Sequence, residues 1–313
     1  MNSLRLQSLI LVLAVSASAA GAADYTGAFL ETTIGARGLG MGGAFTAAVD
    51  DASATFWNPA GLARNRGKGI VATVQPRSLD RKQSSMAGAV NGRGGLGFGF
   101  AWVHAGVDDI IARTGSGEPF GTIDNTEDAL IFALGVPVNP RLAIGFAVKT
   151  IRHEIAVPGS GPSSGTGRAL DVGVVYDLPR ETTVGLALRN VSGRVSWSIE
   201  RRSGETSKTK DQLPTTLAVG IAHSPREGLT LALDAQSSNV ETTFSTGVEW
   251  KVNPMLSVGG GLSRAGSESS VGYPAFSVAV RPMQIDRFQL HYAYLTDDLD
   301  AGALFVAGLS LRW

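Results

Sequence analysis

Beyond residue 66 the chain alternates bulky apolar side chains with small or polar ones, segment after segment. Along 142–149 the sequence LAIGFAVK places Leu, Ile, Phe and Val on one face, and Ala, Gly, Ala and Lys on the other. The same period of two returns at 184–189, 217–222, 229–234, 244–251 and 305–313. Successive side chains of an extended strand point to opposite faces, so this pattern predicts β-strands.

Fourteen such strands are predicted, and they are joined by connections of two kinds. Short turns rich in Gly, Asn and Pro contrast with long links at 106–126, 156–166 and 193–212. We expect the strands at 69–76, 83–91, 95–105, 127–138, 141–155, 167–178, 181–192, 213–225, 228–238, 241–253, 255–264, 269–282, 285–297 and 302–313. An even strand number, with short turns at one end and long loops at the other, is typical of an outer-membrane β-barrel.

The chemistry of the two faces separates a barrel from a soluble β-sandwich. A sandwich buries one apolar face and usually exposes a charged face to water. Here the second face is mostly Gly, Ala and Ser with occasional charges, which suits an enclosed interior. We therefore predict an all-β fold, a transmembrane antiparallel barrel whose bulky side chains contact the outer-membrane lipid.

The first residues predict export. A short basic start, an apolar run from Leu9 to Val15 and the small residues at 20–22 fit a cleaved signal peptide over 1–22. The apolar run is shorter than the ~20 residues that a spanning helix needs. The chain has no cysteine, and its 27 basic residues balance its 27 acidic ones, so it has no basic excess to bind nucleic acid.

Residues 23–66 lack the alternation and precede the predicted barrel, which covers 67–313. The interior of a barrel of about eight strands is filled by its own side chains, whereas a barrel of 16–18 strands leaves an open channel. Fourteen strands with small inward residues therefore enclose a sizeable cavity, which would leak unless something occupied it. We interpret 23–66 as a plug segment.

The predicted plug contains a glycine-rich motif, two adjacent carboxylates and an Asn-Pro step. Glycine lets the backbone approach the barrel wall closely, and the motif lacks the Gly-Lys-Ser/Thr ending of a phosphate loop. Asn and Pro suit the N-cap and first position of a helix. The signature residues are Gly38, Gly40, Gly42, Gly43, Asp50, Asp51, Asn58, Pro59 and Ala60.

Charges also fall on the predicted inward face of the strands. They are Lys149, Asp171, Arg189, Asp234, Glu249, Arg281, His291 and Arg312. Charges that face an interior of low dielectric constant are normally paired. We expect Asp50 and Asp51 to pair with lumenal arginines such as Arg189, Arg281 or Arg312 and so to hold the plug, with a solvated turn as the alternative.

The segment Gly35–Ala63, GARGLGMGGAFTAAVDDASATFWNPAGLA, resembles the N-terminal signature of the PorV/PorQ family of outer-membrane proteins, within the wider FadL-like class. The rest of the chain is similar more loosely, at 170–176, 185–190 and 213–220. The resemblance implies a fourteen-stranded barrel with an N-terminal hatch. FadL-like members take up hydrophobic compounds, whereas PorV-type members serve the type IX secretion system. The polar link 193–212 departs from the apolar external site of fatty-acid members.

The sequence offers no enzyme centre. The histidines, His104, His153, His223 and His291, have no catalytic spacing, and no metal or cofactor motif occurs. Three aspartates at 297–300 suit a solvated external loop better than a calcium site. The strand-end aromatics suggest an interfacial belt, and the terminal Trp313 resembles the signal read by the barrel-assembly machinery.

Two functions follow as hypotheses, and the third alternative is an empty structural barrel or a soluble β-protein. The first is passive transport of small hydrophobic ligands through a plugged barrel. The second is a secretion-system component whose external loops bind or shuttle exported proteins at the cell surface.

Overall fold

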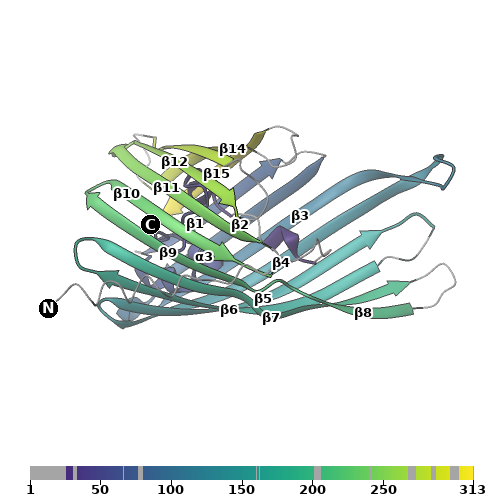
Figure 1. Ribbon diagram of the computed structural model, residues 1–313, viewed down its shortest axis with the longest axis horizontal. Helices are drawn as coiled ribbons and strands as arrows, with labels where there is room; N and C mark the ends of the chain where they lie inside the picture. Colours follow the sequence, from purple (N-terminus) through teal and green to yellow (C-terminus); the bar gives the residue numbers. More distant parts are fainter. Residues whose placement is uncertain are drawn as a thin grey trace.

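The alternating segments form one antiparallel sheet that closes on itself. In the computed structural model, fourteen strands follow one another around the wall in chain order, and β15 pairs with β1 to close it. A fifteenth strand in the described part of the chain, β8, pairs with β7 alone. Figure 1 shows the resulting barrel. The predicted fold class, an all-β antiparallel barrel of fourteen strands, is confirmed.

The structure describes residues 26–30, 34–65, 67–76, 80–159, 161, 163–200, 206–239, 241–266, 273–282, 287–296 and 303–312. The strands are β1 (Lys68–Pro76), β2 (Arg81–Asn91), β3 (Gly97–Arg113), β4 (Pro119–Asn139), β5 (Leu142–Ala156), β6 (Ser163–Leu178), β7 (Thr182–Glu200), β8 (Thr206–Gln212), β9 (Thr216–Arg226), β10 (Leu229–Ser237), β11 (Thr242–Asn253), β12 (Leu256–Ala265), β13 (Tyr273–Val280), β14 (Phe288–Thr296) and β15 (Ala303–Arg312). The helical elements are η1 (Ala28–Leu30), α2 (Ala36–Gly40), α3 (Ala54–Trp57), η2 (Pro59–Arg64) and η3 (Arg93–Gly95). The predicted signal peptide, the aspartates at 297–300 and Trp313 lie outside the described residues. No helix in the described ranges is both long and apolar enough to cross a bilayer.

The two faces of the wall differ as the alternation predicts. On β5, Phe146 and Val148 are 48% and 50% exposed, whereas Ala147 and Lys149 between and beside them are 2% and 1% exposed. The same division holds on neighbouring strands, where the exposed residues include Phe132, Leu170, Leu186, Leu233, Phe276 and Phe305. Bulky side chains therefore cover the outside of the barrel, and small residues and charges face inward.

Two Asn-Pro steps form the same tight turn at one end of the barrel. The side chain of Asn139 accepts hydrogen bonds from the backbone N–H groups of Arg141 and Leu142, at 2.8 and 2.9 Å. Asn253 accepts equivalent bonds from the second and third residues after it, at 2.8 and 2.9 Å. An asparagine side chain can close a turn in this way, while proline prevents the strand from continuing.

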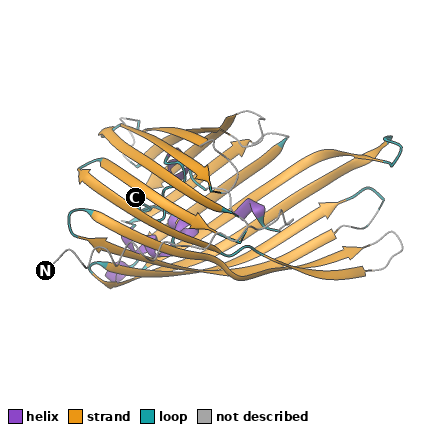
Figure 2. Cartoon of the chain, in the orientation of Figure 1, coloured by secondary structure: helices purple, strands orange, loops and turns teal. Residues whose placement is uncertain are grey.

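The barrel is much taller on one side than on the other. Strands β3 to β7 have 15 to 21 residues, whereas β9 to β15 have 8 to 12. The long strands and β8 project to the right in Figures 1 and 2, beyond the rest of the wall.

The prediction of long links at 106–126 and 193–212 is therefore wrong in part. Most of 106–126 belongs to β3 and β4, and only 114–118 connects them. Residues 194–200 and 206–212 pair as strands. Along 194–200 the outward face is polar, while Val195 and Trp197 face inward, and along 106–126 the adjacent Ile110 and Ile111 are both exposed. The alternation of bulky outward and small inward side chains is therefore missing in both segments.

Candidate functional site

Residues 34–65, here called the lumenal segment, cross the inside of the barrel. Its η2 helix contacts strands β2 to β6, and its α2 helix contacts β12 to β15 on another part of the wall. The largest fully buried side chains include Met41, Phe45, Phe56 and Leu62, all from this segment. The core of the molecule is therefore the packing of the lumenal segment against the inward face of the strands.

Glycines on the inward face of the wall admit the backbone of the lumenal segment. A Cβ atom at Gly185 would lie 2.5 Å from the carbonyl oxygen of Thr46, and one at Gly247 would lie 2.6 Å from that of Met41. A methyl group cannot come so close to these atoms. Five other glycines of the wall approach the lumenal segment as closely: Gly97, Gly135, Gly145, Gly173 and Gly261. These close approaches require glycine in the wall as well as in the segment.

The four signature glycines lie where the segment folds tightly against its surroundings. A Cβ atom at Gly38 would lie 2.8 Å from the Trp57 ring, and one at Gly42 would lie 2.7 Å from the backbone nitrogen of Leu262. Gly42 and Gly43 also have φ angles of +62° and +84°, which other residues rarely adopt. Gly40 contacts Ser277 of β13.

Asn58 fastens two turns of the lumenal segment together. It is the N-cap of η2, and its side chain accepts a hydrogen bond from the N–H of Ala60 at 3.2 Å. Its amide nitrogen donates to the carbonyl oxygens of Thr46, at 3.0 Å, and Val174 of β6, at 3.2 Å. Pro59 occupies the first position of η2, where its missing N–H costs no helical hydrogen bond.

Asp234 of β10 holds the middle of the segment by its backbone. Its Oδ2 accepts hydrogen bonds from the N–H groups of Phe45 and Thr46, at 3.0 and 2.8 Å. Two residues farther along β10, Gln236 donates a hydrogen bond to the carbonyl oxygen of Gly43 at 3.3 Å. Gln236 in turn accepts a 2.7 Å hydrogen bond from Arg189. Gln236 could not be recognised from the sequence, because an uncharged lumenal side chain carries no local signal.

Arg37 joins both carboxylates of the segment to the wall. It contacts Asp50, it lies 3.2 Å from Asp51, and its Nε and Nη2 each lie 2.7 Å from an oxygen of Glu249 on β11. The partner of the two aspartates is thus this residue of the segment itself, and not one of the strand arginines proposed from the sequence. The only sequence signal for Arg37 is its position inside the GAR motif, which does not reveal its partners.

Burial raises the pKa of Asp50, but the charge and hydrogen bond of Arg37 lower it further, so that the pKa falls to about 2. The pKa of Arg37 is raised well above its usual value, because the attraction of its carboxylates outweighs the effect of burial. Both groups therefore stay charged over the whole physiological range, and the link from segment to β11 is ionic.

A second charged group lies deep in the wall of the long strands. Lys149 of β5 lies 2.9 Å from Asp171 of β6 and donates a 2.8 Å hydrogen bond to Asn190 of β7. The N–H of Asn190 donates to Asp171 at 2.8 Å. Asn190 has a φ of +57°, at the point where β7 leaves β9 and pairs with β8. The ammonium of Lys149 and the guanidinium of Arg189 both lie 5.6 Å from the Phe56 ring of the segment.

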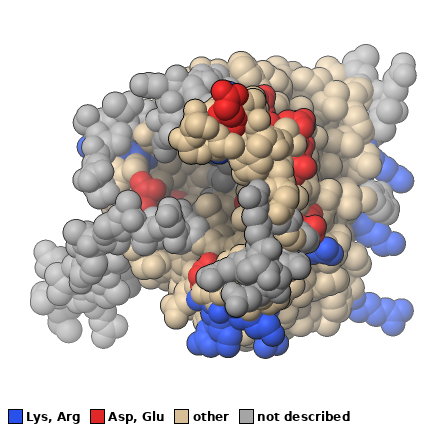
Figure 3. Space-filling view, turned by 90° about the vertical axis from the view of Figure 1, so that its right-hand side faces the viewer, with Lys and Arg blue, Asp and Glu red and all other residues tan. Residues whose placement is uncertain are grey.

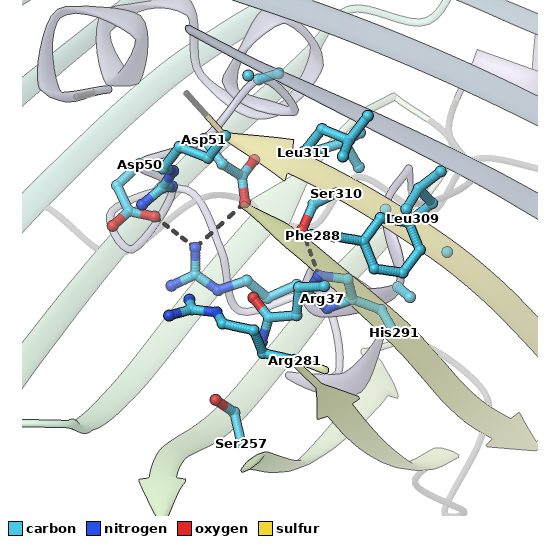
Figure 4. A pocket seen from close by; sticks show the side chains of 18 of the residues that line it. Arg37, Asp50, Asp51, Ser257, Arg281, Phe288, His291, Leu309, Ser310 and Leu311 are labelled. Carbon is cyan, nitrogen blue, oxygen red and sulfur yellow. Dashed lines mark hydrogen bonds and ion pairs between the residues drawn. The ribbon is translucent and has the colours of Figure 1, made fainter. Parts of the chain in front are cut away.

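A polar cavity of about 690 Å³ opens beside the lumenal segment, toward the end of the barrel with the short turns. It is lined by Arg37, Asp50 and Asp51 of the segment and by charged side chains of the wall. The wall contributes Glu249, Lys251, Arg281, Arg287, His291 and Arg312. Figure 4 shows Arg37 reaching toward the two aspartates, with Arg281 beside it and His291 bonded to Ser310. The lining is charged, so it suits water and ions rather than an apolar solute.

The histidines are distributed over the wall and do not converge on one site. Each contacts a polar side chain: His104 lies 3.0 Å from Asp128, His153 2.6 Å from Asn125, His223 3.0 Å from Thr182, and His291 2.8 Å from Ser310. No group of three metal-binding side chains occurs in the ranges that the structure describes.

The chain matches no protein-family profile and no curated protein sequence. Its fold is similar to that of the Ralstonia pickettii toluene transporter TbuX, with a TM-score of 0.64 and 16% identity over 90% of this chain and 98% of that one. A Pseudomonas aeruginosa FadL homologue gives a TM-score of 0.68 at 12% identity, again over 90% and 98%. The Pseudomonas putida toluene transporter TodX gives 0.62 at 14% identity, over 88% and 96%. The chain thus has a FadL-like barrel fold, while the resemblance to the PorV/PorQ family stays a prediction.

Proposed function

We propose that this protein is an outer-membrane channel for the passive transport of small hydrophobic compounds, and that the lumenal segment is its plug. The observation that carries the proposal is the position of that segment, which fills the barrel and is fastened to the wall by polar side chains. Such contacts can be exchanged for water without unfolding any strand. The FadL-like fold supports the same function, since the toluene transporters TbuX and TodX share it.

The outer half of the interior offers an apolar environment for such a ligand. Ile131, Ile151 and Val195 of the long strands form an apolar cluster there with Phe29 and Leu30 of the chain's own N-terminal part. Phe29 and Leu30 are 4% and 2% exposed. They supply apolar surface at a position that a small hydrophobic compound entering from the projecting side would occupy. We infer that the ligand displaces them and that the lumenal segment then shifts.

Beyond the segment, the charged cavity disfavours an apolar solute, because polar groups there would lose water without gaining partners. The ligand therefore leaves only after the segment has moved, either through the lumen or through a gap in the wall.

Uptake of radiolabelled toluene and of a labelled fatty acid by intact cells that express the chain tests this function. Phe29→Ala combined with Leu30→Ala removes the internal competitor, so saturable uptake should begin at lower ligand concentration. Phe132→Ala is the matched control, since this phenylalanine is 57% exposed on the lipid-facing side. Uptake no faster than in cells without the protein would contradict the proposal. No contact in the described part of the chain favours the secretion role.

A further inference from the structure

A group of basic side chains lies on the outer face of the projecting strands, directly beyond the apolar surface. It consists of Arg168 on β6, Arg194 on β7, and Lys208 and Lys210 on β8, and we call it the basic patch. All four side chains are exposed. In Figure 3, which looks onto the projecting end, basic groups lie toward the outside of the molecule and acidic groups gather around the central hollow.

The register of the strands places the basic patch on the lipid-facing side. Arg168 is two residues from Leu170, which is 49% exposed on the same face of β6. Arg194 pairs directly with Arg168, and Lys210 and Lys208 pair with Ser196 and Ser198 farther along β7. Two residues span about 7 Å of strand. The patch therefore begins just above the apolar belt, at the level where lipid headgroups meet the barrel.

The charges of the patch are not compensated within the described part of the protein. None of the four residues forms an ion pair there, although Arg168 and Arg194 stand directly opposite each other on adjacent strands. Like charges in that position destabilise a sheet. The neighbouring Arg152 shows the contrast, because it lies 3.1 Å from Glu154 and pairs in register with Asp128. An external anion would supply a partner for these charges.

We propose that the basic patch binds the phosphate groups of anionic lipids in the outer leaflet of the membrane. A guanidinium presents paired donors that match phosphate oxygens, and an ammonium adds a point charge. Lipid is the partner that fits, because its acyl chains would lie along the exposed apolar residues of β5 to β7 while its phosphates reach the patch. This inference rests on the membrane location of the proposed function but not on transport. Toluene uptake by the variants below therefore separates a failure of the lipid-binding proposal from a failure of the transport proposal.

The test measures the affinity of the purified, folded barrel in neutral detergent for phosphorylated lipid A and for its dephosphorylated form. At about a fivefold gain in affinity for each surface cation, Arg168→Gln with Arg194→Gln should weaken binding of the phosphorylated lipid by roughly 30-fold. Lys208→Gln with Lys210→Gln should weaken it in the same direction. Arg141→Gln with Arg180→Gln, in turns at the opposite end of the barrel, is the matched control and should leave the affinity unchanged.

A further result separates this site from a general charge effect. Without lipid, Arg168→Gln with Arg194→Gln should raise the temperature of barrel unfolding, because the repulsion between opposed arginines is gone. The charge-preserving pair Arg168→Lys with Arg194→Lys should retain most of the lipid binding. Equal affinity for the two lipids, equal stabilisation by inorganic phosphate, or full binding by both glutamine variants would overturn the proposal.

Discussion

Valine in place of Gly185 should release the lumenal segment while leaving the barrel intact. Gly185 faces inward on β7, and a Cβ there would lie 2.5 Å from the carbonyl oxygen of Thr46 and 2.8 Å from Cα of Ala47. Non-bonded heavy atoms settle at about 3.5 Å or more, so the segment must move by about 1 Å. The hydrogen bond from the N–H of Thr46 to Asp234, now 2.8 Å long, would then exceed the normal range.

The size of the effect follows from the cost of overpacking, about 1–3 kcal/mol. That corresponds to an increase of about 5-fold to 150-fold in the ratio of undocked to docked segment. Conductance of single barrels in a planar bilayer measures this ratio, since an undocked segment opens the lumen to ions. We expect longer and more frequent openings than in the unsubstituted protein.

Gly88→Val provides the control, because a Cβ atom at Gly88 of β2 has nothing within 4 Å. Valine suits strand backbone, so neither variant should impair barrel assembly, which heat-dependent migration on a gel verifies. If folded Gly185→Val barrels conduct no more than Gly88→Val barrels, the close approach of the segment to the wall does not keep the lumen closed.

Three further perturbations address the polar contacts of the interior. Because the folded pKa of Asp50 is depressed to about 2, the ionic link of Arg37 should hold at neutral pH and weaken as the pH falls from about 4 toward 2. Protease cleavage of the segment would report the weakening, and Arg37→Met should remove this pH dependence. Cleavage that is independent of pH in the unsubstituted protein would refute the link. Lys149→Met should lower the free energy of unfolding by about 3–5 kcal/mol, because it leaves the carboxylate of Asp171 buried without its cation. In denaturant titrations, the additional substitution Asp171→Leu should recover much of this loss. No recovery would mean that the two residues are not energetically coupled. Asp234→Ala should loosen the segment by about 1–3 kcal/mol, because it leaves the N–H groups of Phe45 and Thr46 without their acceptor. Faster proteolysis of the segment would report this loss, and unchanged proteolysis would exclude this anchor.

Much of the wall could be predicted from the sequence, because strand geometry converts alternation directly into two faces. Leu142 to Lys149 is such a case, and β5 begins and ends within one residue of its predicted bounds. The projecting part of β3 and β4 could not be predicted in this way. There the bulky side chains do not alternate, because Ile110 and Ile111 are adjacent and both exposed, and a register shift separates Val107 from Ile110, so no period of two is left to read.

Individual residues of the interior could be predicted from the sequence, but the contacts between them could not. Asp234 and Glu249 alternate with bulky outward-facing neighbours, and this alternation predicts that both face the lumen. Their partners are backbone amides and Arg37 of the lumenal segment, which lie about two hundred residues away in the chain. No local pattern encodes such contacts. The same is true of Gly185, because its lack of a side chain matters only where the backbone of Thr46 packs against it.

The central claim, that bulky side chains face lipid while the small ones face an enclosed interior, can be measured directly because the chain contains no cysteine. Spin labels attached after Phe146→Cys, Ala147→Cys and Val148→Cys in bilayers can be probed with oxygen, which concentrates in lipid, and with a water-soluble nickel complex. The account predicts high oxygen contact at 146 and 148 and little contact with either probe at 147. Labels at 146 and 148 that are shielded from lipid, as between two packed sheets, or that contact the nickel complex as readily as oxygen, would contradict it.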